Sequence, residues 1–545
     1  MKMMERGVTS FPCRVLALVA AWLIAMPVLA QVVPVPVACV TPTKGCWKQL
    51  PNPGTGAVNV LALKTGKIML QNRGFVAGQQ IYEIFDPITD TFSATSTATV
   101  SHNMYCSGFD QTGESGDILF AGGLFGDDRK RASVYHPDTD TWTAKPDMDA
   151  LRFYPTVITL SNRAVLALDG SGSASSNIPE SYDIRSMKWG SLFAAEYGLA
   201  QAPPKNFELP NYPRFHVLST GKLIYTGSEQ FIPAGGDVTR ILDPVFETWE
   251  QPFAGPDPII GNSGVMYDRD QIMKAGGGTN AWSLAATTPG AQWTQLASMS
   301  QSRFDFFTVA LPDGNVLAVG DVATPEIYDV DADTWTSMTP APQARGDHSG
   351  AVLLHAGPSL TADVFSPPYL FNANGTLAKR PVISRVIGPS LGVIQYGEPF
   401  KLVSKTAALI DEIRLIRLGA ATHSWDMGQQ SMELDFAPAC CNPDDEPGVN
   451  GNPFCFEGAT CCADGTWACN NGDLTPNCPI LPVAQAVELV DPALVVEPVP
   501  SGICTTLTVE APQHPYQSPP GFHYLSIIDG GVPSKSAIIQ AVVCP

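Results

Sequence analysis

A repeated pattern of short strands fills most of the chain and limits its fold more than any other feature. Each unit has a strand, a turn with Gly, a second apolar strand, then a Tyr or Phe, an Asp-Pro-like turn and Thr-Trp or Thr-Phe. The clearest copies span 60–92 and 117–142. Later units end at Trp189, Trp249, Trp293 and Trp335, so the period is 42 to 60 residues. Such a period predicts a ring of four-stranded units.

This ring is expected to be a seven-bladed β-propeller of kelch type, because one blade cannot cover both of its own faces and a closed ring covers them all. The unit from His348 to Phe365 is counted as a blade, which places the propeller at residues 31–375. The tryptophans that end the units are expected to pack between blades rather than to bind a ligand.

A second region begins at about residue 380, where the pattern changes to alternating strands such as 412–418 and 522–528. It predicts an immunoglobulin-like β-sandwich over residues 380–545, so the fold class is all-β. A Cys-rich insert at 438–480 interrupts it and holds seven of the thirteen cysteines of the chain. Disulfides are the default interpretation in an oxidising compartment, and a zinc site is the weaker alternative.

The N-terminal segment indicates export. Basic residues precede an apolar run from Val15 to Leu29, and the small residue Ala30 follows, as in a signal peptide over residues 1–30. No later run is long enough for a membrane anchor. The balance of 32 Lys and Arg against 52 Asp and Glu argues against nucleic acid as a partner. We therefore expect a secreted or periplasmic monomer.

Residues that open the first strand of different blades are the candidates for a site, because these positions converge at the central channel. The candidate residues are Cys106, Tyr154, Tyr212, Asp347 and His348, and His423 follows a strand of the second region, from which a loop would reach the channel. Two histidines with tyrosine and cysteine form a plausible Cu(II) set. Taken singly, each histidine is better explained as a hydrogen-bonded structural residue.

Several motifs in this order resemble the galactose oxidase/glyoxal oxidase family of secreted copper radical oxidases, nearest the glyoxal oxidase branch. The matching segments are Tyr105-Cys106-Ser107-Gly108, Arg152-Phe153-Tyr154-Pro155-Thr156, 365–370, 416–424, 519–524 and 531–534. The resemblance implies a propeller followed by an early-set sandwich domain. It also implies copper as the cofactor.

The resemblance assigns roles to individual residues. Cys106 matches the cysteine that is thioether-linked to an equatorial tyrosine, which matches Tyr154, and the linked pair stores one oxidising equivalent as a radical. His348 and His423 match the copper-binding histidines. The implied activity is oxidation of an aldehyde or primary alcohol, with O₂ reduced to H₂O₂.

Asp347 departs from this pattern, because the family has an axial tyrosine there that ligates copper and accepts the substrate proton. An aspartate would still ligate, but with a reference pKa near ~3.9 it is a weaker base than a tyrosinate near ~10. A second departure is Gly172, where galactose oxidase has a tryptophan. Arg214 is a candidate for orienting a polar or anionic substrate, and a salt bridge at the rim would explain it equally well.

Two further functions remain open from the sequence. One is a non-catalytic propeller that keeps the oxidase scaffold and binds a glycan or protein partner. The other is adhesion through Arg345-Gly346-Asp347, which would require an exposed loop. Cysteine parity also bears on the choice, since twelve cysteines remain after removal of the signal and would close six disulfides if Cys106 were in one of them.

Overall fold

The protein is analysed as a computed structural model, which describes eleven stretches of the chain: 39–51, 53–76, 79–171, 173–227, 238–254, 262–346, 349–353, 363–438, 459–461, 467–469 and 505–543. Throughout these residues the regular structure is β-strand with short 3₁₀ turns. None of their helices is long and apolar enough to cross a membrane. The predicted signal peptide 1–30, Gly172, Asp347, His348 and most of the insert 438–480 lie outside the described residues.

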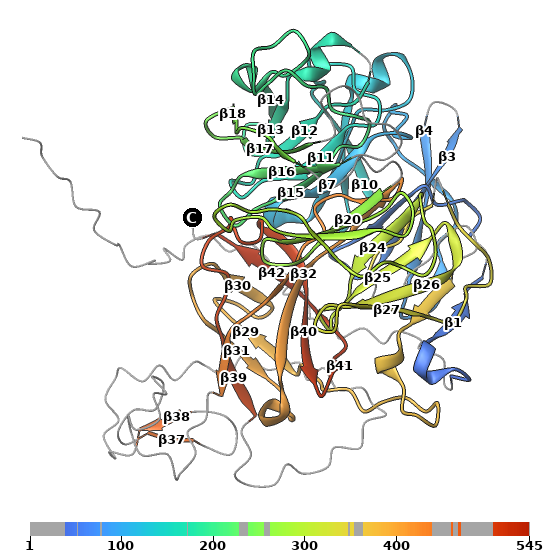
Figure 1. The fold of residues 1–545 in the computed structure, drawn as a ribbon, viewed down its shortest axis with the longest axis vertical. Helices are drawn as coiled ribbons and strands as arrows, with labels where there is room; N and C mark the ends of the chain where they lie inside the picture. The colour runs from blue at the N-terminus through green and yellow to red at the C-terminus, as the bar shows by residue number, and fades with distance from the viewer. Residues whose placement is uncertain are drawn as a thin grey trace, which may run out of the picture.

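Four-stranded antiparallel sheets follow one another around the upper body in Figure 1. Blade 1 is β2 to β5, blade 2 is β7 to β10, blade 3 is β11 to β14, blade 4 is β15 to β18, blade 5 is β20 to β23 and blade 6 is β24 to β27. The bounds are β2 Asn59–Ala62, β3 Ile68–Val76, β4 Gln79–Asp86, β5 Thr91–Phe92, β7 Gly108–Thr112, β8 Asp117–Ala121, β9 Ala132–His136, β10 Thr141–Lys145, β11 Thr156–Thr159, β12 Val165–Leu168, β13 Glu180–Asp183, β14 Lys188–Ser191, β15 Arg214–Val217, β16 Leu223–Gly227, β17 Val238–Asp243, β18 Thr248–Trp249, β20 Asn262–Asp268, β21 Gln271–Gly276, β22 Ala281–Ala285, β23 Thr294–Gln295, β24 Phe306–Ala310, β25 Val316–Gly320, β26 Val322–Asp329 and β27 Thr334–Ser337.

The seventh blade closes the ring with strands from both ends of the propeller. Strand β28 (Asp363–Ser366) pairs antiparallel with β1 (Cys46–Gln49), so that Cys46 lies opposite Ser366. A disulfide joins Cys39 to Cys46 just before β1. Because the first and last strands share one sheet, the ring has no open edge at this point.

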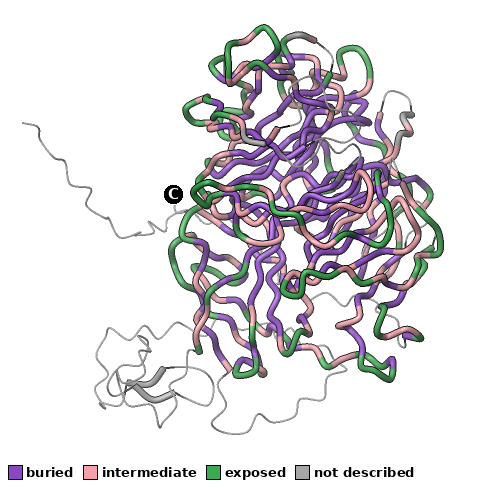
Figure 2. Tube along the Cα trace, in the orientation of Figure 1, coloured by how far each residue is buried: buried purple, intermediate pink, exposed green. Residues whose placement is uncertain are grey.

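Blade tryptophans pack between neighbouring blades, as the repeat predicts. Trp189 donates a hydrogen bond through Nε1 to Pro146 O in the preceding blade at 2.9 Å. Trp249 does the same to Ala195 O at 2.8 Å and meets the Phe207 ring edge-on, with ring centroids 4.9 Å apart. Figure 2 shows the strands of the blades buried and the turns at the periphery exposed.

The second region is a sandwich of two sheets below the propeller in Figure 1. One sheet has the order β29-β31-β39-β36 and the other β30-β42-β40-β32-β35, with β30 parallel to β42. Their bounds are β29 Arg385–Ile387, β30 Val393–Gln395, β31 Phe400–Val403, β32 Glu412–Arg417, β35 Ser431–Glu433, β36 Phe436–Pro438, β39 Thr506–Val509, β40 Gly521–Asp529 and β42 Ala537–Val542. The prediction of an all-β protein, a propeller followed by an immunoglobulin-like sandwich, is confirmed.

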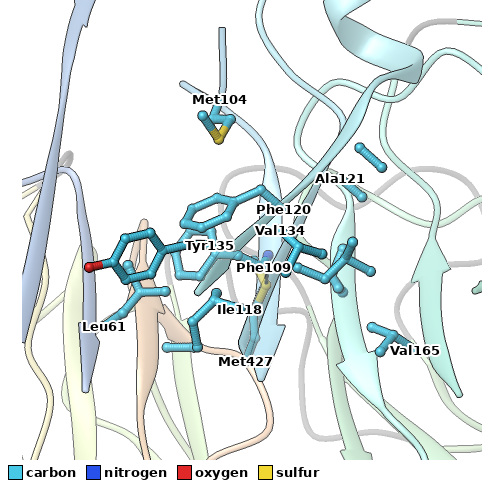
Figure 3. Packing of buried hydrophobic residues seen from close by; sticks show 14 of the residues in the cluster. Leu61, Met104, Phe109, Ile118, Phe120, Ala121, Val134, Tyr135, Val165 and Met427 are labelled. Atoms are coloured by element: carbon cyan, nitrogen blue, oxygen red, sulfur yellow. Dashed lines mark hydrogen bonds between the residues drawn. The ribbon is translucent and has the colours of Figure 1, made fainter. Parts of the chain in front are cut away.

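A hairpin from the sandwich enters the propeller and positions the candidate site. Strands β33 (Ala420–Thr422) and β34 (Trp425–Asp426) add to the inner edge of blade 1, with Val60 of β2 opposite Ala421 of β33. Met427, which follows the hairpin, lies among side chains of blades 1 and 2 in Figure 3. The predicted loop from the second region into the channel is therefore observed, and the two domains share one core there.

Candidate active site

The segments that open blades 2, 3 and 4 are joined side by side through their backbones. Tyr154 donates its backbone N–H to Cys106 O at 2.9 Å, and Tyr212 donates its own to Tyr154 O at 2.8 Å. All three residues have positive φ, at 67°, 62° and 44° for Cys106, Tyr154 and Tyr212. Side chains other than glycine seldom adopt this conformation, and such strain is retained mainly where function requires it.

Cys106 and Tyr154 belong to one packed cluster at this junction. Cys106 is fully buried, with 0% of its surface exposed, and the ring of Tyr154 packs against the cluster that contains it. The Tyr154 ring lies between Phe153, at a centroid distance of 4.1 Å, and Tyr212, at 4.8 Å. The Tyr212 hydroxyl donates to Ser107 O at 2.8 Å. These neighbours hold the Tyr154 ring beside the buried thiol.

His423 lies at the tip of the hairpin from the sandwich and faces the same tyrosines. Its ring centroid is 4.8 Å from that of Tyr154 and 5.1 Å from that of Tyr212. His423 and Ser424 form the two-residue turn between β33 and β34, and both have positive φ, 45° and 63°. Paired positive φ values belong to the tight hairpin turn that normally takes Asn-Gly, so this turn is built around an unusual residue.

A chain of hydrogen bonds fixes the tautomer of His423. The Thr422 hydroxyl donates to Asn59 Oδ1 at 2.7 Å, and the same hydroxyl oxygen lies 2.7 Å from His423 Nδ1. Because the Thr422 proton goes to Asn59, the hydroxyl accepts from Nδ1–H of His423. The Asn59 amide in turn donates to Gln71 Oε1 at 2.5 Å. The lone pair of the ring is therefore on Nε2, the form in which histidine ligates a metal.

Arg214 is buried behind this turn. One terminal nitrogen donates to His423 O and the other to Tyr212 O, both at 3.1 Å, and the guanidinium lies over the Trp425 ring at 5.2 Å. Its exposed fraction is 0%. The structure therefore places the predicted substrate residue in the buried interior behind the His423 turn, bonded to the backbone of that turn and of its own segment, and away from any rim position.

Two further basic side chains lie near Arg214 in blades 4 and 5. Burial, with a smaller contribution from Arg214, lowers the pKa of His216 to about 3 and that of Lys274 to about 8. His216 packs edge-on against Trp425 and borders a cavity of about 10 Å³ together with Gln429 and Gln430. A cavity of this size holds about one water molecule. Near neutral pH, His216 is uncharged.

Four of the predicted positions, Cys106, Tyr154, Tyr212 and His423, are thus brought together from three blades and the sandwich. Asp347 and His348 lie outside the described residues. Within the described part of the chain, no group of three or more His, Cys, Asp or Glu side chains is arranged to hold a metal ion. A His–Tyr donor set nonetheless has the chemistry that Cu(II) prefers.

Comparison with known proteins shows what this chain is similar to. The model for the galactose oxidase-like early set domain matches residues 380–450. Galactose oxidase from Gibberella zeae is 28% identical over 411 residues, which cover 66% of this chain and 58% of that protein. The resemblance to the galactose oxidase/glyoxal oxidase family is confirmed.

The galactose oxidase of Gibberella zeae strain PH-1 is also 28% identical over 411 residues. This chain spans 58% of the length of these curated relatives. A solved structure of a fungal alcohol oxidase of the AA5 family, in complex with copper, superposes with a TM-score of 0.69 at 20% identity, covering 91% of this chain and 99% of that one. That likeness supports the fold. The closer kinship with the glyoxal oxidase branch stays a prediction.

Sequence reasoning did not find the residues that support His423. Asn59, Trp425 and Ser263 carry no motif of their own, and Asn59 is 363 positions from Thr422, which lies within the matching segment 416–424. The signal that was available is local: the hairpin sequence Thr422-His423-Ser424-Trp425 places two side chains with hydrogen-bonding groups where a turn usually has Asn-Gly.

Proposed function

We propose that this protein is a secreted or periplasmic copper radical oxidase that acts as a monomer. It oxidises a small aldehyde or primary alcohol and reduces O₂ to H₂O₂. The observation that supports this best is His423, because its hydrogen bonds with Thr422 and Asn59 leave Nε2 as the basic nitrogen beside the Tyr154 ring. In this tautomer Nε2 carries no proton, so it is able to accept a metal ion.

In this proposal His348, His423, Tyr154 and Asp347 hold the copper. When bound, the copper would supply one of the two oxidising equivalents and polarise the bound oxygen of the substrate. The second equivalent would come from Tyr154 after its ring forms a thioether with Cys106 Sγ. That bond forms with loss of the thiol hydrogen and one ring hydrogen, and O₂ is the oxidant.

Asp347, which matches the family's axial tyrosine, is proposed to be a channel residue on the basis of a feature that two blades share. In blade 3, Arg152 pairs with the buried Glu180 at 2.8 Å, and Tyr154 follows two residues later. Arg345 likewise pairs with Asp363, and Asp347 follows two residues later. Asp347 would then take the proton of the substrate hydroxyl in the role of general base, with less driving force than a tyrosinate because of its lower basicity.

The decisive experiment loads the purified protein with copper and O₂. We expect a mass loss of two hydrogens in a cross-linked peptide pair containing Cys106 and Tyr154, together with peroxide production on glyoxal, methylglyoxal or a simple alcohol. A His423→Phe variant should lose both. A His136→Phe variant is the matched control, because His136 lies at a blade rim and bonds Thr143.

The outcomes separate the candidate functions. Absence of both the cross-link and peroxide in the wild-type protein would refute the oxidase. A cross-link without peroxide would favour the non-catalytic alternative, a propeller that retains the oxidase scaffold and binds a glycan or protein partner.

A further inference from the structure

The turn that carries His423 needs support from outside its own hairpin. His423 and Ser424 both have positive φ, and neither is glycine or asparagine, the residues for which that conformation costs least. The hairpin itself is short, since β33 has three residues and β34 has two. Strain of about 1–3 kcal/mol at each such residue persists only when surrounding contacts determine the conformation.

Those contacts come from two blades and reach the carbonyl groups of the turn itself. Arg214, at the start of blade 4, donates to His423 O at 3.1 Å. Ser263, in the first strand of blade 5, donates through its hydroxyl to Ser424 O at 3.0 Å. Both carbonyls of the two-residue turn are thereby fixed by the propeller, although the turn belongs to the chain of the sandwich.

Arg214 also connects the turn to the tyrosines of the site. Its second terminal nitrogen donates to Tyr212 O, and the Tyr212 backbone N–H is bonded to Tyr154 O. The planar guanidinium therefore fixes the distance between the His423 turn and the Tyr212 segment, and the Tyr212 segment is hydrogen-bonded to Tyr154. Trp425 lies under the guanidinium plane, which adds a cation–π contact to the same arrangement.

A lysine would not replace this side chain. Two donors directed at two separate carbonyls need the rigid fork of a guanidinium, whereas an ammonium is a compact charge on a flexible stem. The site is also fully desolvated, with Arg214 0% exposed, and Arg is the cation more weakly hydrated.

We propose that Arg214 is a positioning residue for His423 and Tyr154, and that it does not bind substrate. It holds the imidazole of His423 at a set distance from the Tyr154 ring by bonding the His423 carbonyl and the Tyr212 carbonyl of its own segment, and the Tyr212 N–H is bonded in turn to Tyr154 O. This inference rests on the proposed copper oxidase function, because it treats His423 and Tyr154 as partners in one metal site.

The test uses Arg214→Met, which keeps the length of the side chain but removes its donors, and Arg214→Lys, which keeps the charge. Arg240→Met is the matched control, because Arg240 is also buried in blade 4, lies 3.9 Å over the Phe207 ring and donates to Pro204 O. Each protein is measured for hydrogen exchange of the peptide spanning 420–427 without metal, for Cu(II) affinity, and for KM and kcat per bound copper.

Both Arg214 variants should lose exchange protection in the hairpin and bind Cu(II) about 10- to 100-fold more weakly, as is typical when a group that orients a metal ligand is removed. KM per bound copper should not change, and Arg240→Met should match the wild type in all three measurements. A raised KM with wild-type copper affinity and exchange would instead show a substrate role and overturn the proposal. So would wild-type behaviour of Arg214→Lys, or an equal loss in Arg240→Met.

Failure of the proposed function is distinguishable from failure of this inference. If the wild-type protein binds no Cu(II), the oxidase proposal fails, and the exchange measurement still decides whether Arg214 holds the His423 turn. If the wild-type protein binds Cu(II) and exchange in Arg214→Met is unchanged, the positioning role alone is refuted.

Discussion

Among the described residues, left-handed backbone at residues other than glycine is found both at the blade rims and in the channel, and these two groups differ in what holds them. At the blade rims it is found at aspartates of the repeated turns, such as Asp140 and Asp333. Their carboxylates accept the hydroxyls of nearby tyrosines, as Tyr135 and Tyr328 donate to them at 2.9 and 2.8 Å. In the channel the same conformation is found at Cys106, Tyr154, Tyr212 and His423.

The rim turns contain a residue suited to them, because aspartate tolerates this conformation. Its carboxylate accepts hydrogen bonds from its own blade and from the preceding one, as Tyr82 donates to Asp140 and the Ala297 N–H to Asp333. Cysteine, tyrosine and histidine have no such local preference. Their conformations depend on backbone bonds between blades and on the hairpin from the sandwich. Residues that recur in every repeat therefore form the blades of the propeller. The candidate site is formed by residues that occur once and are bonded to several blades and to the sandwich.

The largest effect should follow from removing the channel thiol. We expect Cys106→Ser to abolish the cross-link with Tyr154 and to lower kcat by more than about 10³-fold, since covalent and electrostatic groups of a site contribute at this scale. The thermal unfolding midpoint should stay close to that of the wild type, because serine is similar in size. Peroxide assays and calorimetry measure the two effects. If Cys106→Ser retained turnover, the claim that the channel residues carry the activity would be contradicted.

A substitution in the packing between blades should lower stability and leave the site intact. Trp249→Ala removes a 5% exposed indole that packs on Phe207 and bonds Ala195 O, so we expect a loss of about 3–5 kcal/mol in the free energy of unfolding. Copper affinity of the folded protein should be unchanged. Denaturant unfolding with a copper titration checks this, and Trp249→Phe should be milder. If copper affinity were lost while the protein remained folded, the separate roles of the blade-packing residues and the channel residues would be contradicted.

Replacing Asp347, the proposed general base, should raise activity. Asp347→Tyr supplies a stronger base, and general base catalysis is worth about 10²- to 10⁴-fold, so we expect kcat to increase by about 10²-fold. Asp331→Tyr is the control, because Asp331 is an exposed residue of the turn between β26 and β27. Lower activity in Asp347→Tyr than in the wild type would show that the channel is adapted to the carboxylate.

The smallest expected effect is on the pH dependence of the free energy of unfolding. The folded pKa of His216, about 3, lies below its ordinary value near ~6.5, so protonation favours the unfolded chain. Its contribution to stability is present above pH ~6.5 and is lost at up to ~1.4 kcal/mol per unit as pH falls toward the folded value. His216→Phe should remove this loss, measured by denaturant unfolding at pH 4 to 7. An unchanged pH dependence would contradict it.

Part of this organisation could be predicted from the sequence. The Thr-Trp repeats alone predict the blades, because each unit repeats the same local rule of strand, turn and packing aromatic. The motifs around Cys106, Tyr154 and His423 also indicated which segments contribute residues to the candidate site. The domain boundaries near 375–380 remain a prediction, with β28 ending at Ser366 and β29 beginning at Arg385.

What the sequence by itself determined is therefore the ring of blades, the sandwich after it and the residue types available to the channel. Only the tertiary structure decided that Asn59 and Thr422 set the tautomer of His423, and that Arg214 lies in the buried interior behind the His423 turn. The physical reason is distance along the chain. Local propensity and spacing act over a few residues, whereas these bonds join Arg214 to a turn 209 positions away and exist only once the ring and the hairpin have closed.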